Sequence, residues 1–389
     1  MNFKVYILAV STVIVGLVEL IVGGILPIIA EDLNITIGSA GQLITVFALV
    51  YAISGPVLLS LTAKVERKKL YLITLSIFFV GNILTYFSSN FSYVMVARVI
   101  TAMSAALVIV LSLTITSKIV LPSYRAKALG IIYMGVSSAL VLGVPFGIVL
   151  TNLFSWRTVF LAIACLTVIA FVLIYIFLEQ IPPEEVKPLQ TQIKALANLK
   201  VIGAHLAIMF MLAGHYTFYA YLTPFLEANF GLGGYWISVC YFLFGIAAVS
   251  GGAIGGSLAD RIGASKSMLI FISSFAIVLF VLPYTTFSLP IFIIMMMVWG
   301  ALSWSNSPPT QSYVIQVDPE HSDIHQSFNN SAIQVGIALG SAVGGWVVEQ
   351  QTSVSHTATV GSGLVIIALI CASASIALPR RTQIVKVEE

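Results

Sequence analysis

Charged residues and cysteine are scarce in this chain of 389 residues. Asp, Glu, Lys and Arg make up 8% of the chain, whereas 59% of the residues are hydrophobic. Soluble domains carry about 25% charged residues. The composition therefore excludes an ordinary soluble domain and favours a protein whose solvent is the lipid bilayer.

The few cysteines and histidines do not form a metal or disulfide pattern. Cys165, Cys240 and Cys371 lie in different apolar stretches without C-x-x-C spacing. We predict buried thiols that pack like small hydrophobic groups, and no disulfide framework. His321 and His325 stand four residues apart beside acidic residues, but a solvated helix start explains them better than a weak metal site. We predict no metal and no cofactor.

The sequence motifs of ATP-binding loops and of zinc-dependent active sites are also missing. The chain has no G-x-x-x-x-G-K-S/T loop for ATP and no H-E-x-x-H pair for zinc. No basic stripe stands on a soluble domain, so we expect no nucleic-acid partner. No gap between apolar stretches is long enough for a soluble output domain. We therefore predict that the chain is not an enzyme, and a membrane-embedded enzyme or sensor stays a remote alternative.

Apolar stretches of membrane length fill most of the chain. About 20 apolar residues cross a hydrocarbon core of about 30 Å as a helix, which satisfies its own backbone hydrogen bonds. We therefore predict an all-α integral membrane protein with twelve transmembrane helices. The expected spans are 5–29, 41–62, 70–88, 92–117, 126–150, 157–178, 201–226, 235–258, 267–286, 289–313, 327–349 and 357–378.

The positive charges are sorted between the two sides of these spans. Sixteen of the eighteen Lys and Arg residues fall in the tails and in alternate gaps, and only Arg98 and Arg157 do not. The positive-inside rule then places both termini in the cytoplasm of a multi-pass protein. The first apolar run continues past Glu19 to Pro27, so we expect a retained helix rather than a cleaved signal peptide.

A polar segment divides the spans into six plus six. The region 180–200 is rich in proline and charge, which suits a cytoplasmic linker, and 193–199 is expected to lie on the membrane surface. We predict an N-terminal bundle over 1–179 and a C-terminal bundle over 201–389. Short basic turns after spans two and eight repeat at equivalent places, as in transporters that rock two halves about a central site.

Several short motifs resemble the major facilitator superfamily along almost the full length of the chain. Gly256-x-Leu258-Ala259-Asp260-Arg261-x-Gly263 is similar to its cytoplasmic loop signature. The first-half copy keeps Arg67 but has Ala63 and Glu66 where the family usually has Asp and Gly. The resemblance implies two six-helix bundles and conformational roles for Arg67, Asp260 and Arg261. We expect a monomer, because each chain already holds both halves.

The fifth span narrows the resemblance to the 12-spanner drug:proton antiporters. Gly143-Val144-Pro145-Phe146-Gly147 is similar to the antiporter signature, and these small residues permit a bend and close helix contact. The stretches 16–27, 212–217 and 326–331 resemble bacterial purine base and nucleoside efflux permeases. This resemblance implies purine efflux at the cytoplasmic membrane of a bacterium. Multidrug and sugar efflux pumps are the alternatives.

Two charged residues lie inside spans. A charge at bilayer depth costs several kcal/mol unless it is paired or faces water, so Glu19 and Arg98 are expected to face the bundle interior. A carboxylate whose distance to the arginine changes between inward and outward states can bind and release a proton. We predict proton coupling through Glu19, tuned by Arg98. A fixed ion pair, or two separate polar sites, are the structural alternatives.

Polar and aromatic residues in spans seven, ten and eleven are candidates for substrate binding. Carboxamides can pair with the edges of a nucleobase, and aromatic rings can stack on its plane. Packing between helices, or a position at the membrane interface, explains some of them equally well. The candidates are His215, Tyr219, Tyr221, Trp304, Asn306, Asn330 and Gln334.

Overall fold

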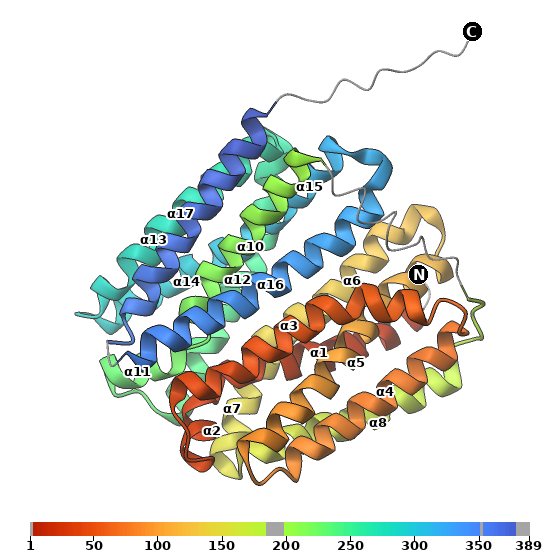
Figure 1. Cartoon of the computed structure of the whole chain (residues 1–389), viewed down its shortest axis with the longest axis horizontal. Coiled ribbons are helices and arrows are strands. Elements are labelled where there is room, and N and C mark those ends of the chain that lie inside the picture. Colours follow the sequence, from red (N-terminus) through yellow and green to blue (C-terminus); the bar gives the residue numbers. More distant parts are fainter. Residues whose placement is uncertain (1–2, 184–197, 351–352, 379–389) are drawn as a thin grey trace.

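The protein is a long bundle of helices in a computed structural model (Figure 1), which describes residues 3–183, 198–350 and 353–378. Among the described residues, twelve helical spans are long and apolar enough to cross a membrane. The twelve predicted spans are thereby confirmed, with boundaries that agree within five residues except at the seventh span, which ends at Tyr219 instead of residue 226. Most of the linker predicted at 180–200 lies outside the described residues, as does the basic tail beyond residue 378.

The first half of the chain forms spans one to six. Its helices are α1 (Lys4–Gly24), α2 (Leu26–Asp32), α3 (Ile37–Leu61), α4 (Arg67–Tyr86), α5 (Phe91–Ile119), α6 (Arg125–Ser138), α7 (Val144–Leu153) and α8 (Trp156–Phe177). A short 3₁₀ turn, η1 (Pro122–Tyr124), precedes α6, and a π-helical turn, η2 (Ala139–Gly143), joins α6 to α7 as one span.

The second half forms spans seven to twelve. Its helices are α10 (Leu199–Tyr219), α11 (Leu222–Phe230), α12 (Gly234–Ile262), α13 (Ala264–Val281), α14 (Leu289–Ser305), α15 (Ser307–Val317), α16 (Ser322–Glu349) and α17 (His356–Ala377). Two 3₁₀ turns, η3 (Leu282–Thr285) and η4 (Pro319–His321), follow α13 and α15.

Three spans that the sequence predicts as continuous are broken. The first breaks at Ile25, the seventh between α10 and α11, and the tenth at Asn306. In each case a proline lies in the first turn of the next helix, at Pro27, Pro224 or Pro308. Proline is tolerated there because a first-turn N–H has no partner within the helix. Spans one and seven, which correspond in the two halves, are thus both interrupted.

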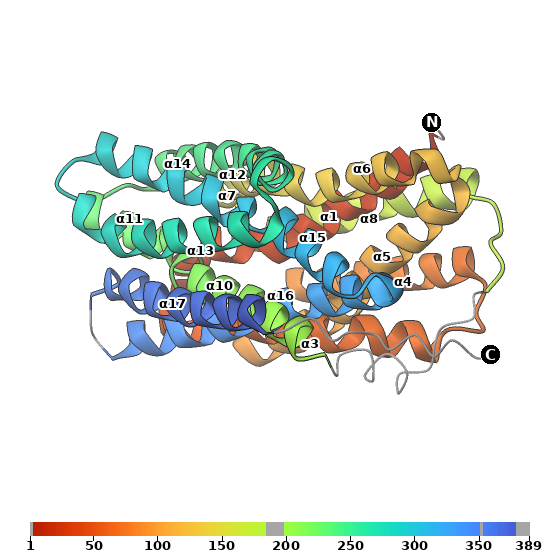
Figure 2. The same ribbon diagram turned by 90° about the horizontal axis from the view of Figure 1, so that it is seen from above.

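The helices pack as two bundles that meet along a long seam (Figures 1 and 2). Within the N-terminal bundle α1 packs on α6 and α8, and α4 packs on α5 and α8. Within the C-terminal bundle α10 packs on α16 and α17, and α12 packs on α14. The bundles contact each other through α3 with α16 and through α7 with α12. The seam between them is where a site shared by both halves must lie.

Glycines allow the close packing of α10 and α16. A Cβ at Gly336, Gly340 or Gly344 would collide with a backbone oxygen on α10. Small residues let membrane helices approach closely, because the bilayer gives no hydrophobic force between them. The small-residue face of this span therefore has a packing role inside the C-terminal bundle.

The two ends of the molecule differ in charge. Lys4 at the start of α1 forms an ion pair with Glu179 after α8 at 2.6 Å, and Lys200 at the start of α10 donates to the carbonyl of Ile376 near the end of α17. We call the end that carries these lysines the basic end.

The prediction of three buried thiols is confirmed for Cys240 alone. Cys371 on α17 is half-buried and Cys165 on α8 is exposed, because the outer face of a membrane helix can meet lipid instead of protein.

Candidate substrate and proton site between the bundles

A carboxylate and a carboxamide meet at the seam. Gln334 on α16 donates from Nε2 to Oε1 of Glu19 on α1 at 2.7 Å, although the two residues are 315 positions apart in the chain. Glu19 is partly exposed, whereas Gln334 is buried. The second amide atom, Oε1 of Gln334, has no hydrogen-bond partner among the described residues. The pair therefore joins the two bundles and leaves an acceptor for a further donor.

Arg98 lies beside this pair but does not bind Glu19 directly. Its Nη1 donates to the carbonyl of Val18 at 2.9 Å and its Nε to the carbonyl of Leu43 at 3.3 Å. The guanidinium also lies over the ring of Phe47, 4.1 Å from the centroid. In the described part of the chain no ion pair joins Arg98 to Glu19, so the fixed ion pair is not formed. Arg98 instead ties α5 to α1 and α3.

Two tyrosines complete the surroundings of Glu19. Tyr51 on α3 and Tyr216 on α10 both interact electrostatically with this carboxylate. Tyr51 also interacts with the side chain of Asn330, one turn before Gln334. Tyr51 was not among the residues predicted from the sequence. Its position at the centre of the second span, far from either membrane interface, was the available signal.

The predicted residues His215 and Tyr219 lie in an aromatic cluster inside the C-terminal bundle. Their rings stack with centroids 5.2 Å apart, and Trp299 lies 5.1 Å from His215. Both side chains are buried. Such ring pairs stabilise a protein by more than the burial of their apolar surface alone. Tyr216 contacts both rings and connects this cluster to the surroundings of Glu19. The geometry favours packing for His215 and Tyr219, one layer behind the seam.

The remaining substrate candidates lie apart from the Glu19 pair. Tyr221 is buried and donates to the carbonyl of Ser341 at 2.9 Å. Asn306 is buried and donates to the sulfur of Met211 at 3.0 Å, and Trp304 packs half-buried against the core. Among the described contacts none joins these three side chains to Glu19. Of the predicted residues, the structure brings together Glu19, Arg98, Asn330 and Gln334.

The broken helices meet across the seam. The hydroxyl of Thr223, in the first turn of α11, lies 3.1 Å from the carbonyl oxygens of Gly23 and of Gly24, the last residues of α1. It also lies 3.2 Å from the hydroxyl of Tyr241. The last carbonyls of a helix have no partner within it. The C-terminal bundle thus satisfies the broken end of α1 in the N-terminal bundle.

Further crossing contacts gather at the end opposite the basic end. Glu349 accepts hydrogen bonds from Thr36 at 2.8 Å and from Ser39 at 3.3 Å, and Ser238 donates to the carbonyl of Pro145 at 2.9 Å. Between the Glu19 pair and the basic end, Ser331 on α16 donates to the carbonyl of Ala52 on α3 at 3.0 Å, and Gln326 makes an exposed hydrogen bond to the Tyr133 hydroxyl at 3.3 Å. More of the described hydrogen bonds between the bundles therefore lie toward the opposite end.

The fifth span has a π-helical turn and a close contact with α1 at its glycines and proline. The π-helical turn ends at Gly143, immediately before α7. A Cβ at Gly143 or Gly147 would lie within 3 Å of Leu17 or Ile21 on α1. Sharp changes of helix direction commonly occur at proline and at π turns. These residues fix how α7 packs on α1, next to the Glu19 segment.

The two basic loop motifs differ in structure. In the first half, Glu66 caps α4: its carboxylate accepts from the amides of Lys68, Lys69 and Ile181 at 2.7 to 2.8 Å. Partial burial alone would raise the pKa of Glu66, but these amides hold the pKa below its usual value. Arg67 is buried there. Glu66, which departs from the family pattern, thus fastens α4 to the segment after α8.

In the second half, Asp260 and Arg261 are exposed at the end of α12. Neither forms a hydrogen bond or ion pair within the ranges that the structure describes. No described contact in this conformation bears on the conformational roles of Asp260 and Arg261. These roles therefore stay predictions.

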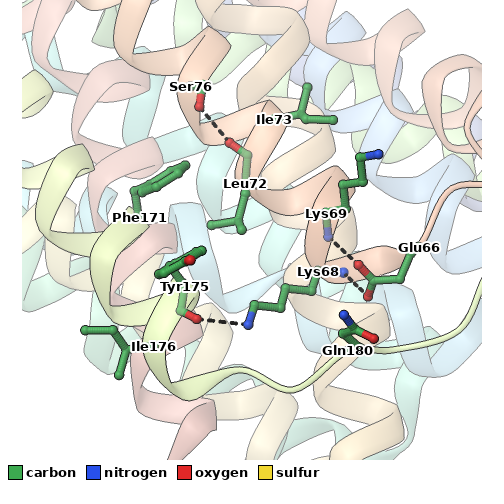
Figure 3. Close-up of a pocket in the computed structure, with 10 residues that line it drawn as sticks. All are labelled: Glu66, Lys68, Lys69, Leu72, Ile73, Ser76, Phe171, Tyr175, Ile176 and Gln180. Carbon is green, nitrogen blue, oxygen red and sulfur yellow. Dashed lines mark hydrogen bonds between the residues drawn. The ribbon is translucent and has the colours of Figure 1, made fainter.

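A groove of about 680 Å³ lies on the outer side of the N-terminal bundle (Figure 3). It is bordered by α4 and α8, with Lys68 and Lys69 at one end and apolar side chains such as Phe171 along it. Lys68 donates to the carbonyl of Tyr175 at 2.9 Å. Because α4 and α8 form the edge of the bundle away from the seam (Figure 1), this groove is separate from the Glu19 site.

The fold and the seam define a multi-pass membrane transporter. The sequence pattern of the Major Facilitator Superfamily matches residues 8–323. The chain belongs to this superfamily. Its relatives are named as transporters, so it is a transport protein rather than an enzyme.

Relatives span nearly the whole chain. A Bacillus subtilis (strain 168) protein named "Uncharacterized MFS-type transporter YbcL" is 36% identical over 95% of this chain and 94% of its own length. The Escherichia coli (strain K12) inner membrane transport protein YdhP is 26% identical over 95% of both chains.

Solved structures share the fold. The nucleoside transporter NupG (D323A mutant) has a TM-score of 0.75 at 16% identity, over 96% of this chain and 100% of that one. A bacterial homolog of the human lysosomal transporter Spinster has a TM-score of 0.74 at 16% identity, over 96% of this chain and 97% of that one. At these identities the likeness shows the fold alone.

Proposed function

We propose that this chain is a proton-coupled antiporter that exports purine bases or nucleosides by alternating access. The hydrogen bond from Gln334 to Glu19 carries the proposal. This bond joins Glu19, the ionisable residue of the first span, to the polar side chain of Gln334 in the other bundle. An ionisable residue within a transmembrane segment is a functional candidate by default.

Competition between the proton and the substrate for the Glu19 carboxylate would couple their movements across the membrane. An ionised carboxylate accepts hydrogen bonds only, while a protonated one offers a donor in place of one acceptor. An N–H group on the substrate that donates to Glu19 would therefore bind the ionised form better. Proton uptake from outside would then favour release of the substrate, and proton loss to the inside would restore the binding form. Exchange of proton for substrate follows.

The amides suit a flat heterocycle. Gln334 offers a free acceptor and Asn330 is a second carboxamide one turn away, while Tyr51 and Tyr216 provide nearby rings. Carboxamides can pair with both donor and acceptor edges of a nucleobase. A fold neighbour is named a nucleoside transporter, which adds weak support. Sugars and amphipathic drugs are the rival substrates.

Alternating access would break and remake the crossing contacts. Rocking of the two bundles opens one end as the other closes. The bonds at the opposite end, with Thr223 and Glu349, would separate when the site opens to that side. Both termini are assigned to the cytoplasm in this proposal because the basic end carries most of the lysines.

The test is transport of radiolabelled hypoxanthine in liposomes, with and without an imposed pH gradient. We expect gradient-driven movement in the wild type and none in Glu19→Gln, which should still bind the substrate, but more weakly than the wild type and independently of pH. Glu320→Gln is the matched control, since Glu320 is an exposed carboxylate that forms no hydrogen bond or ion pair among the described residues. Equal gradient-driven transport by Glu19→Gln would overturn the coupling role. No hypoxanthine movement by folded protein would overturn the purine assignment and direct the assay to sugars and drugs.

A further inference from the structure

Three ligating side chains converge at the basic end of the C-terminal bundle. His321 Nδ1 and His325 Nε2 lie 3.1 and 3.0 Å from Oδ2 of Asp318. One ligand atom from each of the three residues falls within 4.8 Å of the others. From the sequence alone we predict a solvated helix start here. That view is wrong for His325, whose side chain is only 1% exposed.

The spacing suits a small divalent metal ion. Zinc binds imidazole nitrogen at about 2.0 to 2.1 Å and carboxylate oxygen at about 2.0 to 2.2 Å, usually with tetrahedral geometry. Ligand atoms around such an ion stand about 3.3 Å apart. The measured separations of 3.0 and 3.1 Å therefore need only small side-chain rotations to admit one.

A fourth histidine provides an independent observation. His205, near the start of α10, is 8% exposed, and its ring centroid lies 6.1 Å from that of His325. Neither of its ring nitrogens has a hydrogen-bond partner among the described residues, and Nδ1 of His325 also has none. Leaving a buried polar group without a hydrogen-bond partner is unfavourable. A bound ion would give His205 a partner.

We infer that Asp318, His321 and His325 form a binding site for a divalent transition-metal ion such as Zn²⁺, with His205 as the fourth ligand. The donor set decides the class of ion. Imidazole suits zinc, copper, iron and nickel, whereas magnesium and calcium prefer oxygen ligands. Three imidazoles with one carboxylate therefore select against Mg²⁺ and Ca²⁺.

The site would connect three helices next to a crossing contact. His205 belongs to α10, Asp318 follows α15, and His325 lies in the first turn of α16. The next residue, Gln326, donates across the seam to Tyr133. An ion held here would fix the ends of these helices together, and with them the position of the Gln326 contact. The site is distinct from the Glu19 pair, and the inference does not depend on the transported substrate.

The experiment uses the full-length purified protein, free of any histidine tag and treated with chelator. Zn²⁺ alone is the first probe, with affinity measured by competition against a chromogenic chelator. Co²⁺ is the second probe, because its visible absorption reports a tetrahedral site. We expect one Zn²⁺ per chain and a tetrahedral Co²⁺ spectrum. Absence of either in folded wild-type protein would overturn the inference.

Variants then locate the ion. Asp318→Asn and His325→Asn are expected to weaken Zn²⁺ binding by at least about tenfold, since even outer partners of a metal ligand are worth about 10- to 100-fold. His205→Gln is expected to do the same. His356→Gln is the control, because His356 is an exposed histidine at the start of α17, and should change nothing.

The comparison among variants decides the assignment. Equal binding in wild type, Asp318→Asn and His325→Asn would place the ion elsewhere and overturn the site. Unchanged affinity in His205→Gln would overturn the fourth ligand. Circular dichroism and size-exclusion chromatography confirm the fold of each variant before its affinity is compared, and the Co²⁺ spectrum of the wild type tests the site without any variant.

Discussion

The contact between the broken helices predicts a shift in conformation when one hydroxyl is removed. Thr223 bridges α11 to the carbonyls of Gly23 and Gly24 at the end of α1. Thr223→Val keeps the shape of the side chain but leaves those carbonyls without this donor. The bond exists only while the bundles are together at this end. Its loss therefore weakens the closed conformation relative to the open one.

The size of the shift follows from measured hydrogen bonds in membranes. Side-chain bonds between membrane helices are worth about 0.6 kcal/mol on average and about 1.7 kcal/mol at most. A free energy of about 1.4 kcal/mol corresponds to a tenfold change in an equilibrium constant. The ratio of closed to open molecules should therefore fall by about 3-fold, and by at most about 18-fold.

Distances between spin labels measure this ratio in proteoliposomes. Phe154 in the N-terminal half and Phe287 in the C-terminal half are 72% and 77% exposed, and both lie in turns at the end opposite the basic end. Labels on Phe154→Cys and Phe287→Cys, with the three native cysteines replaced, report the separation of the bundles there. Thr223→Val should increase the population of the longer distance.

A second threonine provides the control. Thr167 donates only to the carbonyl of Ile163 in its own helix α8, at 2.7 Å. Thr167→Val removes a buried hydroxyl without touching the seam, so its distance distribution should match that of the parent protein. An unchanged distribution in Thr223→Val, or an equal shift in Thr167→Val, would refute the reasoning.

Two further predictions concern the packing of single helices. Glu66→Ala removes the cap of α4 and should lower the free energy of unfolding by about 1 kcal/mol, whereas exposed Glu320→Ala should not. Because the folded-state pKa of Glu66 lies below its usual value, its stabilisation is present at neutral pH and disappears as the pH falls through that pKa. The difference between wild type and Glu66→Ala in detergent melting should therefore shrink in acid. Gly340→Ala should lower stability by about 1 to 3 kcal/mol, because its Cβ meets the backbone of α10, whereas Gly363→Ala meets nothing within 4 Å.

Either prediction has a clear contrary result. Equal melting of Glu66→Ala and Glu320→Ala at neutral pH would contradict the capping role. Equal melting of Gly340→Ala and Gly363→Ala would show that α10 and α16 can separate at little cost.

Local sequence features predicted the spans because the bilayer imposes a one-dimensional rule. A stretch must be long and apolar enough to cross, whatever its neighbours are. The helix breaks were missed because apolar residues continue through them. Pro27 and Pro224 were the available signals, but a proline near a span end does not say whether another helix will satisfy the broken backbone. Thr223 does so from the other half of the chain.

The sequence by itself determined the number and order of the membrane spans and the sorting of positive charge between the two ends. It also identified Glu19 and Arg98 as interior charges, because their cost in lipid depends only on depth. The tertiary structure decided the partners: Glu19 meets Gln334 rather than Arg98, and His205 joins His325. Such pairs depend on how α1, α10 and α16 pack, and helix packing is set by the fit of many side chains at once rather than by any local pattern.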